Sequence, residues 1–234
     1  PLFEEKMQPF IQALLDSKFR PDAEKRFGKL LFVNAELAVK CFSPAIVDLL
    51  QEENKLVSEY DKLIASAKID FDGKTLNLAQ LGPYKENADR AVRKAAYEAD
   101  GNFFLSHEKE FDEIYDKLVK VRTEIGKKLG YDTFTPVGYM HMQRNCYTPE
   151  MVDTFRKQVL DDLVPVANRL RDMQAKRIGL DKLSLYDLLF TFKEGNPKPD
   201  GTADKLVAEA VKMYHEMSER TGVFIDFMTD NGLM

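Results

Sequence analysis

The chain has 234 residues, enough for one large domain or two small ones, and a formal net charge of −5. Hydrophobic residues make up 44% and charged residues 31%, which favours a soluble globular protein over a disordered or membrane protein. No Lys/Arg block stands free of acidic residues, which argues against nucleic acid as a partner. No apolar run approaches the roughly 20 residues that cross a bilayer, and the first residues lack a signal-peptide pattern. We therefore expect a cytoplasmic protein with no membrane partner.

Helical periodicity dominates the first part of the chain. Residues 21–42 carry a helical face at three- and four-residue spacing, which predicts one helix over this range. Ser43 and Pro44 then form an N-cap and a first helical position, and a second helix is predicted over residues 45–66. We interpret residues 1–67 as an N-terminal helical region. The face of the first helix is formed by Phe27, Leu30, Leu31, Asn34, Leu37 and Ala38.

A short β-hairpin is predicted near residues 68–79. Apolar residues alternate with polar ones on both sides of Asp72-Gly73. Alternation of this kind is typical of a half-buried strand, and Asp-Gly is a preferred two-residue hairpin turn. Gly82-Pro83 is expected to close the hairpin.

Helical periodicity returns at Glu86 and continues to about Lys128, with a predicted weak point at Gly101 and a C-terminal cap at Gly130. The stretch 131–147 is irregular and has room for a short helix.

A further long helix is predicted to start at Thr148, and Pro165 should bend or divide it. Residues 194–202 are the clearest loop, and Thr202 caps a last predicted helix. The predicted fold is therefore mainly α, with long packed helices and one small hairpin, and residues 68–234 form a helical lobe.

Two segments come close to a zinc-binding motif. Residues 107–111 read HEKEF, so Phe111 stands where an HExxH helix has its second histidine, and His107 is expected to be structural or solvated. In YHEMSE, His215 and Glu219 can share one helix face as ligands, but a third ligand is lacking and a salt-bridged surface is favoured. We therefore assign no catalytic residue and no metal ligand.

The segment GYMHMQRNCYTPE gathers four candidate binding residues between two predicted helices. They are Tyr139, His141, Arg144 and Tyr147. Arg binds carboxylates through two donors, and Tyr offers ring area and a hydroxyl, so this loop can line a cleft. The alternative is a structural turn in which Arg144 pairs with a neighbouring Asp and the tyrosines cover the core. Spacing alone favours the structural turn.

Five segments resemble the oligoendopeptidase F branch of the thimet-oligopeptidase family of zinc metallopeptidases by their order and spacing. The resemblance covers the chain from about residue 69 to its end. The segments are ADRAVRKAAYEA, IGKKLGYDTF, GYMHMQRNCYTPEMVDTFRKQVLDDLVP, LYDLLF and KMYHEMSERTGVFIDFM.

The resemblance implies a mainly helical, two-lobed enzyme with a deep channel that hydrolyses short peptides. In that family, an HExxH helix and a downstream Glu hold the zinc, and no position here matches them. The chain starts at Pro1 without an initiator methionine, so we expect a piece of a longer protein that precedes the catalytic core.

This piece is expected to be inactive alone and to bind no zinc itself, while the complete enzyme binds Zn²⁺. Its partners are then short peptides and the missing catalytic lobe. The resemblance makes Tyr139, His141, Arg144 and Tyr147 channel-wall residues, with Arg144 placed either on a peptide carboxylate or in a structural ion pair. A non-catalytic helical scaffold or binding protein is the alternative reading.

Overall fold

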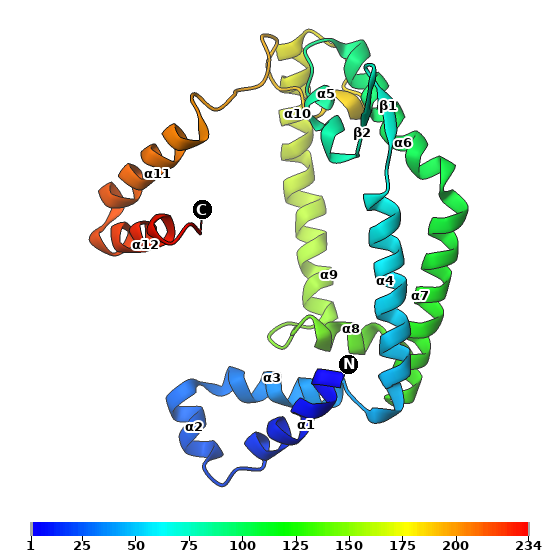
Figure 1. Cartoon of the computed structure of the whole chain (residues 1–234), viewed down its shortest axis with the longest axis vertical. Coiled ribbons are helices and arrows are strands. Elements are labelled where there is room, and N and C mark those ends of the chain that lie inside the picture. Colours follow the sequence, from blue (N-terminus) through cyan, green and yellow to red (C-terminus); the bar gives the residue numbers. More distant parts are fainter. Residues whose placement is uncertain (1, 234) are drawn as a thin grey trace. The chain divides into compact units, whose positions relative to one another are not determined.

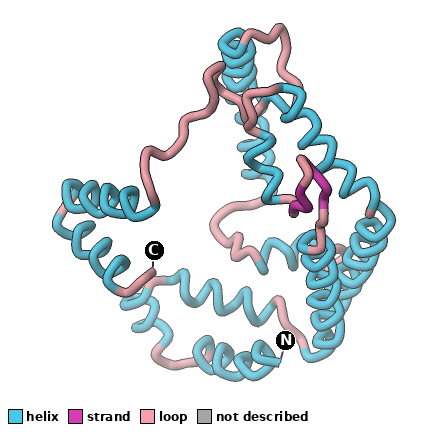
Figure 2. Tube along the Cα trace, turned by 45° about the horizontal axis from the view of Figure 1, so that its top comes forward, coloured by secondary structure: helices cyan, strands magenta, loops and turns pink. Residues whose placement is uncertain are grey.

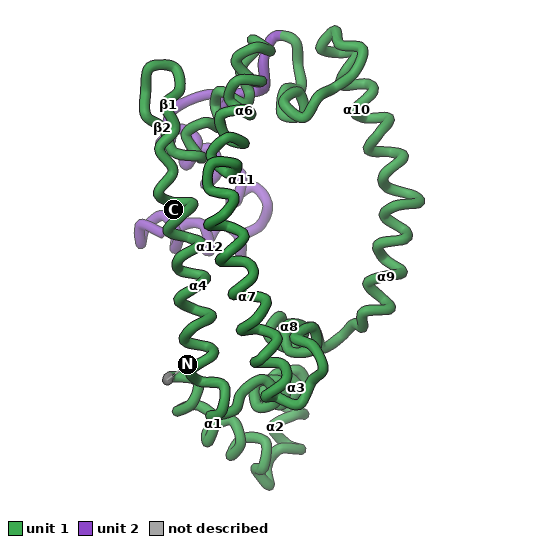
Figure 3. Tube along the Cα trace, turned by 90° about the vertical axis from the view of Figure 1, so that its right-hand side faces the viewer, with its two compact units in different colours: residues 1–193 green, residues 194–234 purple. Residues whose placement is uncertain are grey.

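A computed structural model describes residues 2–233 as two compact units, with unit 1 ending at Lys193 and unit 2 beginning at Glu194 (Figure 3). Helices dominate both units, and a single hairpin contains the strands of the described residues (Figure 2). The predicted fold class is confirmed. The predicted boundary near residue 67 stays a prediction, and helices from either side of it share one core.

The N-terminal segment contains two α-helices more than the periodicity predicted (Figure 1). The predicted helix over 21–42 is wrong, because Gly28 adopts φ 89°, which a right-handed helix does not contain. The elements are α1 (Leu2–Leu15), α2 (Arg20–Phe27), α3 (Lys29–Lys40), a 3₁₀ turn (Pro44–Ile46) and α4 (Val47–Ala65). The predicted Ser43 cap is confirmed, since its hydroxyl accepts a hydrogen bond from the Ala45 N–H at 3.3 Å.

The predicted hairpin is confirmed as strands β1 (Ile69–Phe71) and β2 (Lys74–Leu76), which pair antiparallel. Both residues of the Asp72-Gly73 turn have positive φ, 53° and 69°, as a type I′ turn requires. The hairpin is followed by a 3₁₀ turn (Ala79–Leu81) and the short helix α5 (Gly82–Lys85).

Helices α6 (Arg90–Ser106) and α7 (Glu108–Lys128) meet at His107 and not at the predicted weak point, Gly101. The Ser106 hydroxyl donates to the Phe103 carbonyl oxygen at 2.8 Å, and His107 Nδ1 lies 2.9 Å from the same oxygen. Side chains that bond to the backbone in this way compete with the helical ladder. The break therefore forms where they do so, while Gly101 is accommodated inside α6.

Two apolar cores hold unit 1 together. In the first, α4, α7 and α8 (Thr135–His141) pack around the fully buried side chains of Ile46, Ile125 and Val137. In the second, the hairpin packs on α6 through Ile69, Leu81 and Phe103. The predicted cap after α7 is confirmed: Gly130 has φ 88°, and the Tyr131 N–H donates to the Gly126 carbonyl at 2.9 Å.

A long rod follows α8, built from α9 (Pro149–Gln158), a π-helical turn (Val159–Leu163) and α10 (Val164–Ile178). Pro165 has no N–H to donate to the preceding turn, so the predicted division of this helix is confirmed. All residues from Leu160 to Met173 are exposed within unit 1. The middle of the rod is therefore held by little more than its own backbone, and its position depends on its two ends.

The C-terminal end of the rod is fixed to α6 by a buried ionic cluster. Asp187 lies in the 3₁₀ turn Leu185–Asp187 and is 0% exposed, and Arg93 on α6 is 2% exposed. Asp187 Oδ1 accepts from Arg93 Nη2 at 2.9 Å, and Oδ2 accepts from Arg90 Nη2 at 2.9 Å. The amide of Gln174 on α10 then donates to the Asp187 carbonyl and to the carbonyls of Leu188 and Phe190 just after the turn, the last at 2.7 Å. A chain of hydrogen bonds thus runs from α6 to α10.

Unit 2 is a helical hairpin of α11 (Ala203–Met217) and α12 (Glu219–Asp230), which pack against each other. The predicted Thr202 cap is confirmed by its hydroxyl, which accepts from the Lys205 N–H at 3.4 Å. Ser218 separates the two helices with an extended backbone and accepts from the Thr221 N–H at 3.2 Å.

No single helix of the described residues meets the length and apolarity needed to span a membrane. By length and composition alone, one bent pair does, formed by Lys29–Lys40 and Pro44–Ala65.

Replacing Asp187 with Asn should destabilise the protein by about 3–5 kcal/mol, because it removes one partner of a buried ion pair and leaves the Arg93 charge uncompensated. Urea denaturation followed by circular dichroism measures the change. Arg90→Gln is the matched control with a clearly smaller expected loss, since the Arg90 side chain is 44% exposed. An Asp187→Asn protein within about 1 kcal/mol of the unaltered protein would contradict the role of the cluster.

The same cluster predicts a loss of stability in acid. Burial raises the pKa of Asp187, but hydrogen bonds from Arg90, the Ser184 N–H and Arg93 outweigh it and lower the pKa from 3.8 to about 2. A carboxylate with a lowered pKa stabilises the fold above its ordinary pKa, and this contribution is lost as the pH falls through the folded-state value. The stability gap between the unaltered protein and Asp187→Asn should therefore narrow from about pH 4 to about pH 2. A stability difference that stays constant over this pH range would contradict the stabilising role of the ionised Asp187 carboxylate.

Candidate functional site

The first zinc-like segment forms a helix junction. His107 is the single residue between the end of α6 and the start of α7, and its ring centroid lies 4.6 Å from that of Phe103. Phe111 packs with the aromatic rings of Tyr60 and Phe104. His107 and Phe111 therefore lie at a bend filled with aromatic side chains. This agrees with the prediction that His107 is structural or solvated.

The second segment does not form a shared helix face. Ser218 ends α11 before Glu219, so His215 and Glu219 lie on different helices, and their predicted common face is wrong. His215 Nε2 instead lies 2.8 Å from Asp226 Oδ1 across the hairpin of unit 2. This agrees with the salt-bridged surface favoured from the sequence.

Within residues 2–233 no three His, Cys, Asp or Glu side chains gather closely enough to hold a metal ion. The described residues therefore do not fit the zinc that the resemblance implies.

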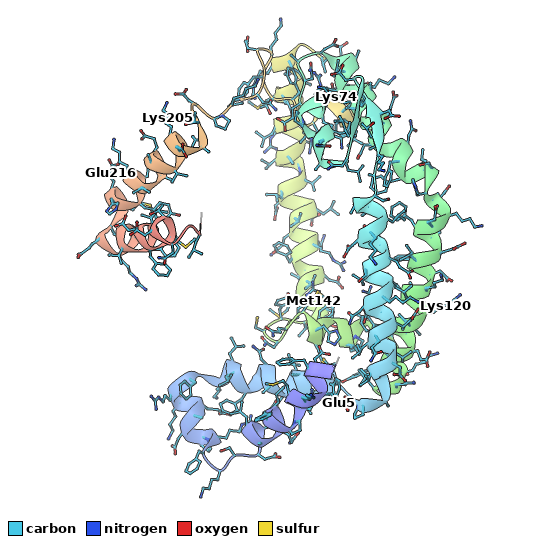
Figure 4. The ribbon with its side chains drawn as sticks, viewed as in Figure 1. Glu5, Lys74, Lys120, Met142, Lys205 and Glu216 are labelled. Carbon is cyan, nitrogen blue, oxygen red and sulfur yellow. The ribbon has the colours of Figure 1, made fainter. Side chains whose placement is uncertain are left out.

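The loop between α8 and α9 is shaped by a Schellman motif at the end of α8. The Gln143 N–H donates to the Met140 carbonyl at 2.9 Å, and the Arg144 N–H donates to the Tyr139 carbonyl at 3.0 Å. The motif needs a left-handed residue, and Gln143 takes that conformation with φ 51° although glycine is the usual choice. The reversal brings Arg144 back over the preceding helical turn. Figure 4 labels Met142 at this point of the chain.

Arg144 makes cation–π contacts with two of the predicted tyrosines. Its Cζ lies 4.7 Å from the centroid of the Tyr139 ring and 6.0 Å from that of Tyr147. Within residues 2–233 the Arg144 side chain makes neither an ion pair nor a hydrogen bond. The predicted Arg–Asp pair of the structural interpretation is therefore absent from the described residues.

A cavity of about 460 Å³ lies beside the Arg144 side chain. It is lined by Arg144, Tyr147, Met151, Val152 and Phe155. Met151 and Phe155 are four residues apart in α9 and therefore lie on one apolar face of the helix, while Tyr147 precedes the Thr148 cap. Met151 and Phe155 were not predicted as site residues, although their four-residue spacing was available as a signal.

His141 belongs to a different cavity. That cavity has a volume of about 420 Å³ between α1, α3 and α8, and it is lined by His141 and Gln143 together with Leu37 and Cys41. The structure thus brings three of the four predicted residues together and places His141 apart from them. The Asn145 side-chain amide donates to the Asn34 oxygen on α3 and ties the loop to that helix.

Comparison with known proteins identifies the family. The family model of peptidase family M3 matches residues 83–221, more than half of the chain. The chain belongs to peptidase family M3. A comparison with curated proteins gives no match.

Three solved structures are similar to this M3 chain over its whole length. PZ peptidase A with an inhibitor is 49% identical with a TM-score of 0.94. A protein assigned as oligoendopeptidase F from Bacillus anthracis str. Ames is 47% identical with a TM-score of 0.91, and another protein assigned as oligoendopeptidase F is 46% identical with a TM-score of 0.94. The chain covers 42%, 43% and 41% of these proteins, respectively. The resemblance inferred from the five sequence segments is confirmed.

The conformation of Gln143 gives a stability prediction for the site loop. Gln143→Gly should be neutral or stabilising by up to about 1 kcal/mol because it relieves the left-handed strain, whereas Gln143→Val should destabilise by about 1–2 kcal/mol. Urea denaturation of both variants measures the difference.

Gln158→Gly serves as the control, since Gln158 has a right-handed helical backbone and glycine should cost about 1 kcal/mol there. If Gln143→Gly and Gln158→Gly destabilise equally, the left-handed conformation of Gln143 is not a source of strain.

Proposed function

We propose that this chain is part of a zinc-dependent oligopeptidase that hydrolyses short peptides. The observation that carries the proposal is the match to peptidase family M3 over residues 83–221, together with 49% identity to PZ peptidase A over the whole chain. The chain covers less than half of each similar structure, so the activity is proposed for the longer enzyme. This chain alone is proposed to be inactive, and the enzyme is proposed to be cytoplasmic.

The chain's own contribution is proposed to be a wall of the substrate channel. Support comes from the loop between α8 and α9, where a cation in contact with the rings of Tyr139 and Tyr147 lies beside an apolar cavity. Peptides offer carbonyl oxygens, a terminal carboxylate and apolar side chains, which such a surface can bind. His141 is proposed to contact substrate from the neighbouring cavity.

The remaining lobe of the enzyme is proposed to pack on the exposed face of the rod. Six large apolar side chains between residues 160 and 173 of the rod are exposed within unit 1, and exposed apolar surface of this kind marks an interaction site. They are Leu160, Leu163, Val164, Val166, Leu170 and Met173.

Zinc, when bound in the complete enzyme, would supply a water nucleophile and polarise the peptide carbonyl. Since the described residues do not form a set of ligands, the metal ligands are proposed to lie outside this chain. This chain's residues are assigned only binding and positioning of the peptide.

The direct test is a chimera of PZ peptidase A in which this chain replaces the matching segment. The chimera should hydrolyse quenched fluorescent peptides and lose this activity to a chelator, because the chain is 49% identical to the matching segment and has its fold, with a TM-score of 0.94. PZ peptidase A itself is the positive control, and this chain alone is the negative control.

A chimera that folds by circular dichroism and binds zinc, yet hydrolyses no peptide, would contradict the proposed function and favour a helical scaffold. Zinc bound stoichiometrically by this chain alone, with chelator-sensitive hydrolysis, would contradict the placement of the metal site.

A further inference from the structure

We propose that Arg144 binds a carboxylate of the peptide, and that the cavity beside it takes a large apolar side chain next to that carboxylate. This inference rests on the proposed peptidase function and adds the chemical class of peptide that this part of the enzyme selects. The carboxylate can be the peptide's C-terminus or an acidic side chain, and both present the same planar pair of oxygens.

The guanidinium of Arg144 has two aromatic neighbours. The Tyr139 and Tyr147 rings have their centroids 4.7 Å and 6.0 Å from Cζ. A cation–π contact uses the charge of the guanidinium and takes up none of its five N–H donors. The tyrosines therefore hold the group in place without consuming its donors.

Arg144 differs from other partly buried arginines of unit 1 because it lacks a carboxylate partner among the described residues. Other partly buried arginines of unit 1 have carboxylate partners: Arg20 bonds Glu24 and Glu36, and Arg122 bonds Glu53. Arg144 is also partly buried, but within residues 2–233 it has no acidic partner. A guanidinium with free donors in partly desolvated surroundings is complementary to an anion that binds there.

The cavity beside Arg144 has an apolar wall. Met151 and Phe155 are 56% and 64% exposed, and with Val152 they form the apolar side of the cavity. The wall loses its water when a ligand covers it, and this strengthens a charge-assisted hydrogen bond beside it. It also offers contact area for a large aliphatic or aromatic side chain. A carboxylate adjoining such a side chain matches both features.

The local fold fixes these groups relative to one another. The Schellman bond from the Arg144 N–H to Tyr139 and the Thr148 cap of α9 bracket the loop on both sides. The bond from Asn145 to Asn34 attaches it to α3. A preformed site loses little entropy when it binds a ligand, so the donors are ready for one planar anion.

The experiment measures binding of fluorescein-labelled peptides to this chain by fluorescence anisotropy. One peptide ends in a Leu with a free carboxylate and has no acidic side chain, and its twin ends in the Leu amide. A second pair carries a C-terminal amide with either Asp or Asn next to the Leu. The free acid or the Asp peptide should bind at least about tenfold more tightly than its uncharged twin, because a hydrogen bond to a charged group is lost. The pair that shows the difference identifies the source of the carboxylate.

Variants assign the preference to Arg144. Arg144→Gln should abolish the difference between the charged and uncharged twins, and Arg144→Lys should keep only part of it because the planar fork is lost. Arg169→Gln, on the exposed part of the rod, is the matched control and should keep the full difference. Circular dichroism verifies that each variant is folded. The comparison of the twin peptides uses the unaltered chain and therefore does not depend on the folding of any variant.

Three results would overturn the inference. If charged and uncharged peptide twins bind equally well, Arg144 does not bind a carboxylate of the peptide. Peptide binding by this chain, and with it the proposed function, would still hold. If the preference exists but Arg144→Gln retains it, the carboxylate binds elsewhere. Absence of binding for every peptide would remove both the carboxylate site and the proposed substrate wall of this chain.

Discussion

The carboxylate of Asp187, buried between Arg93 and Arg90, determines where one end of the long rod meets the rest of unit 1. Burying a carboxylate is costly unless it is paired and hydrogen-bonded, and here both oxygens accept bonds from a guanidinium or the backbone. The carbonyls of Asp187, Leu188 and Phe190 accept hydrogen bonds from the Gln174 amide on α10. Since the middle of the rod is exposed, these end contacts replace the packing that normally positions a helix.

The other end of the rod carries the candidate site, and a different device positions it. The Schellman motif at Gln143 returns the chain over Tyr139, and the Thr148 cap starts α9 directly afterwards. Non-glycine residues in the left-handed region are found disproportionately at functional sites, where the surrounding structure over-determines them. In this chain the strained residue immediately precedes Arg144, the cation for which the described residues provide no carboxylate.

Features that depend on neighbours in sequence could be predicted, and features that depend on distant partners could not. The Asp72-Gly73 turn and the division at Pro165 follow from backbone conformations that those residues impose themselves. The break at His107 was missed because it arises from side chains that bond the preceding turn. Asp187 has its partner 94 residues away, and no spacing rule connects them. For the same reason the sequence could not decide whether Arg144 is paired with a carboxylate. The apolar face of α9 beside it could have been predicted from the four-residue spacing of Met151 and Phe155.

A double-mutant cycle between Arg93 and Asp187 tests most directly whether this buried pair organises unit 1. Arg93→Met, Asp187→Leu and the double variant are compared with the unaltered protein by urea denaturation. The account predicts that the double variant loses less stability than the sum of the two single losses, by about 2 kcal/mol or more, because each single variant leaves one buried charge without a partner. Single losses that add within about 0.5 kcal/mol would mean that the two residues act independently and that the cluster does not hold the rod to α6.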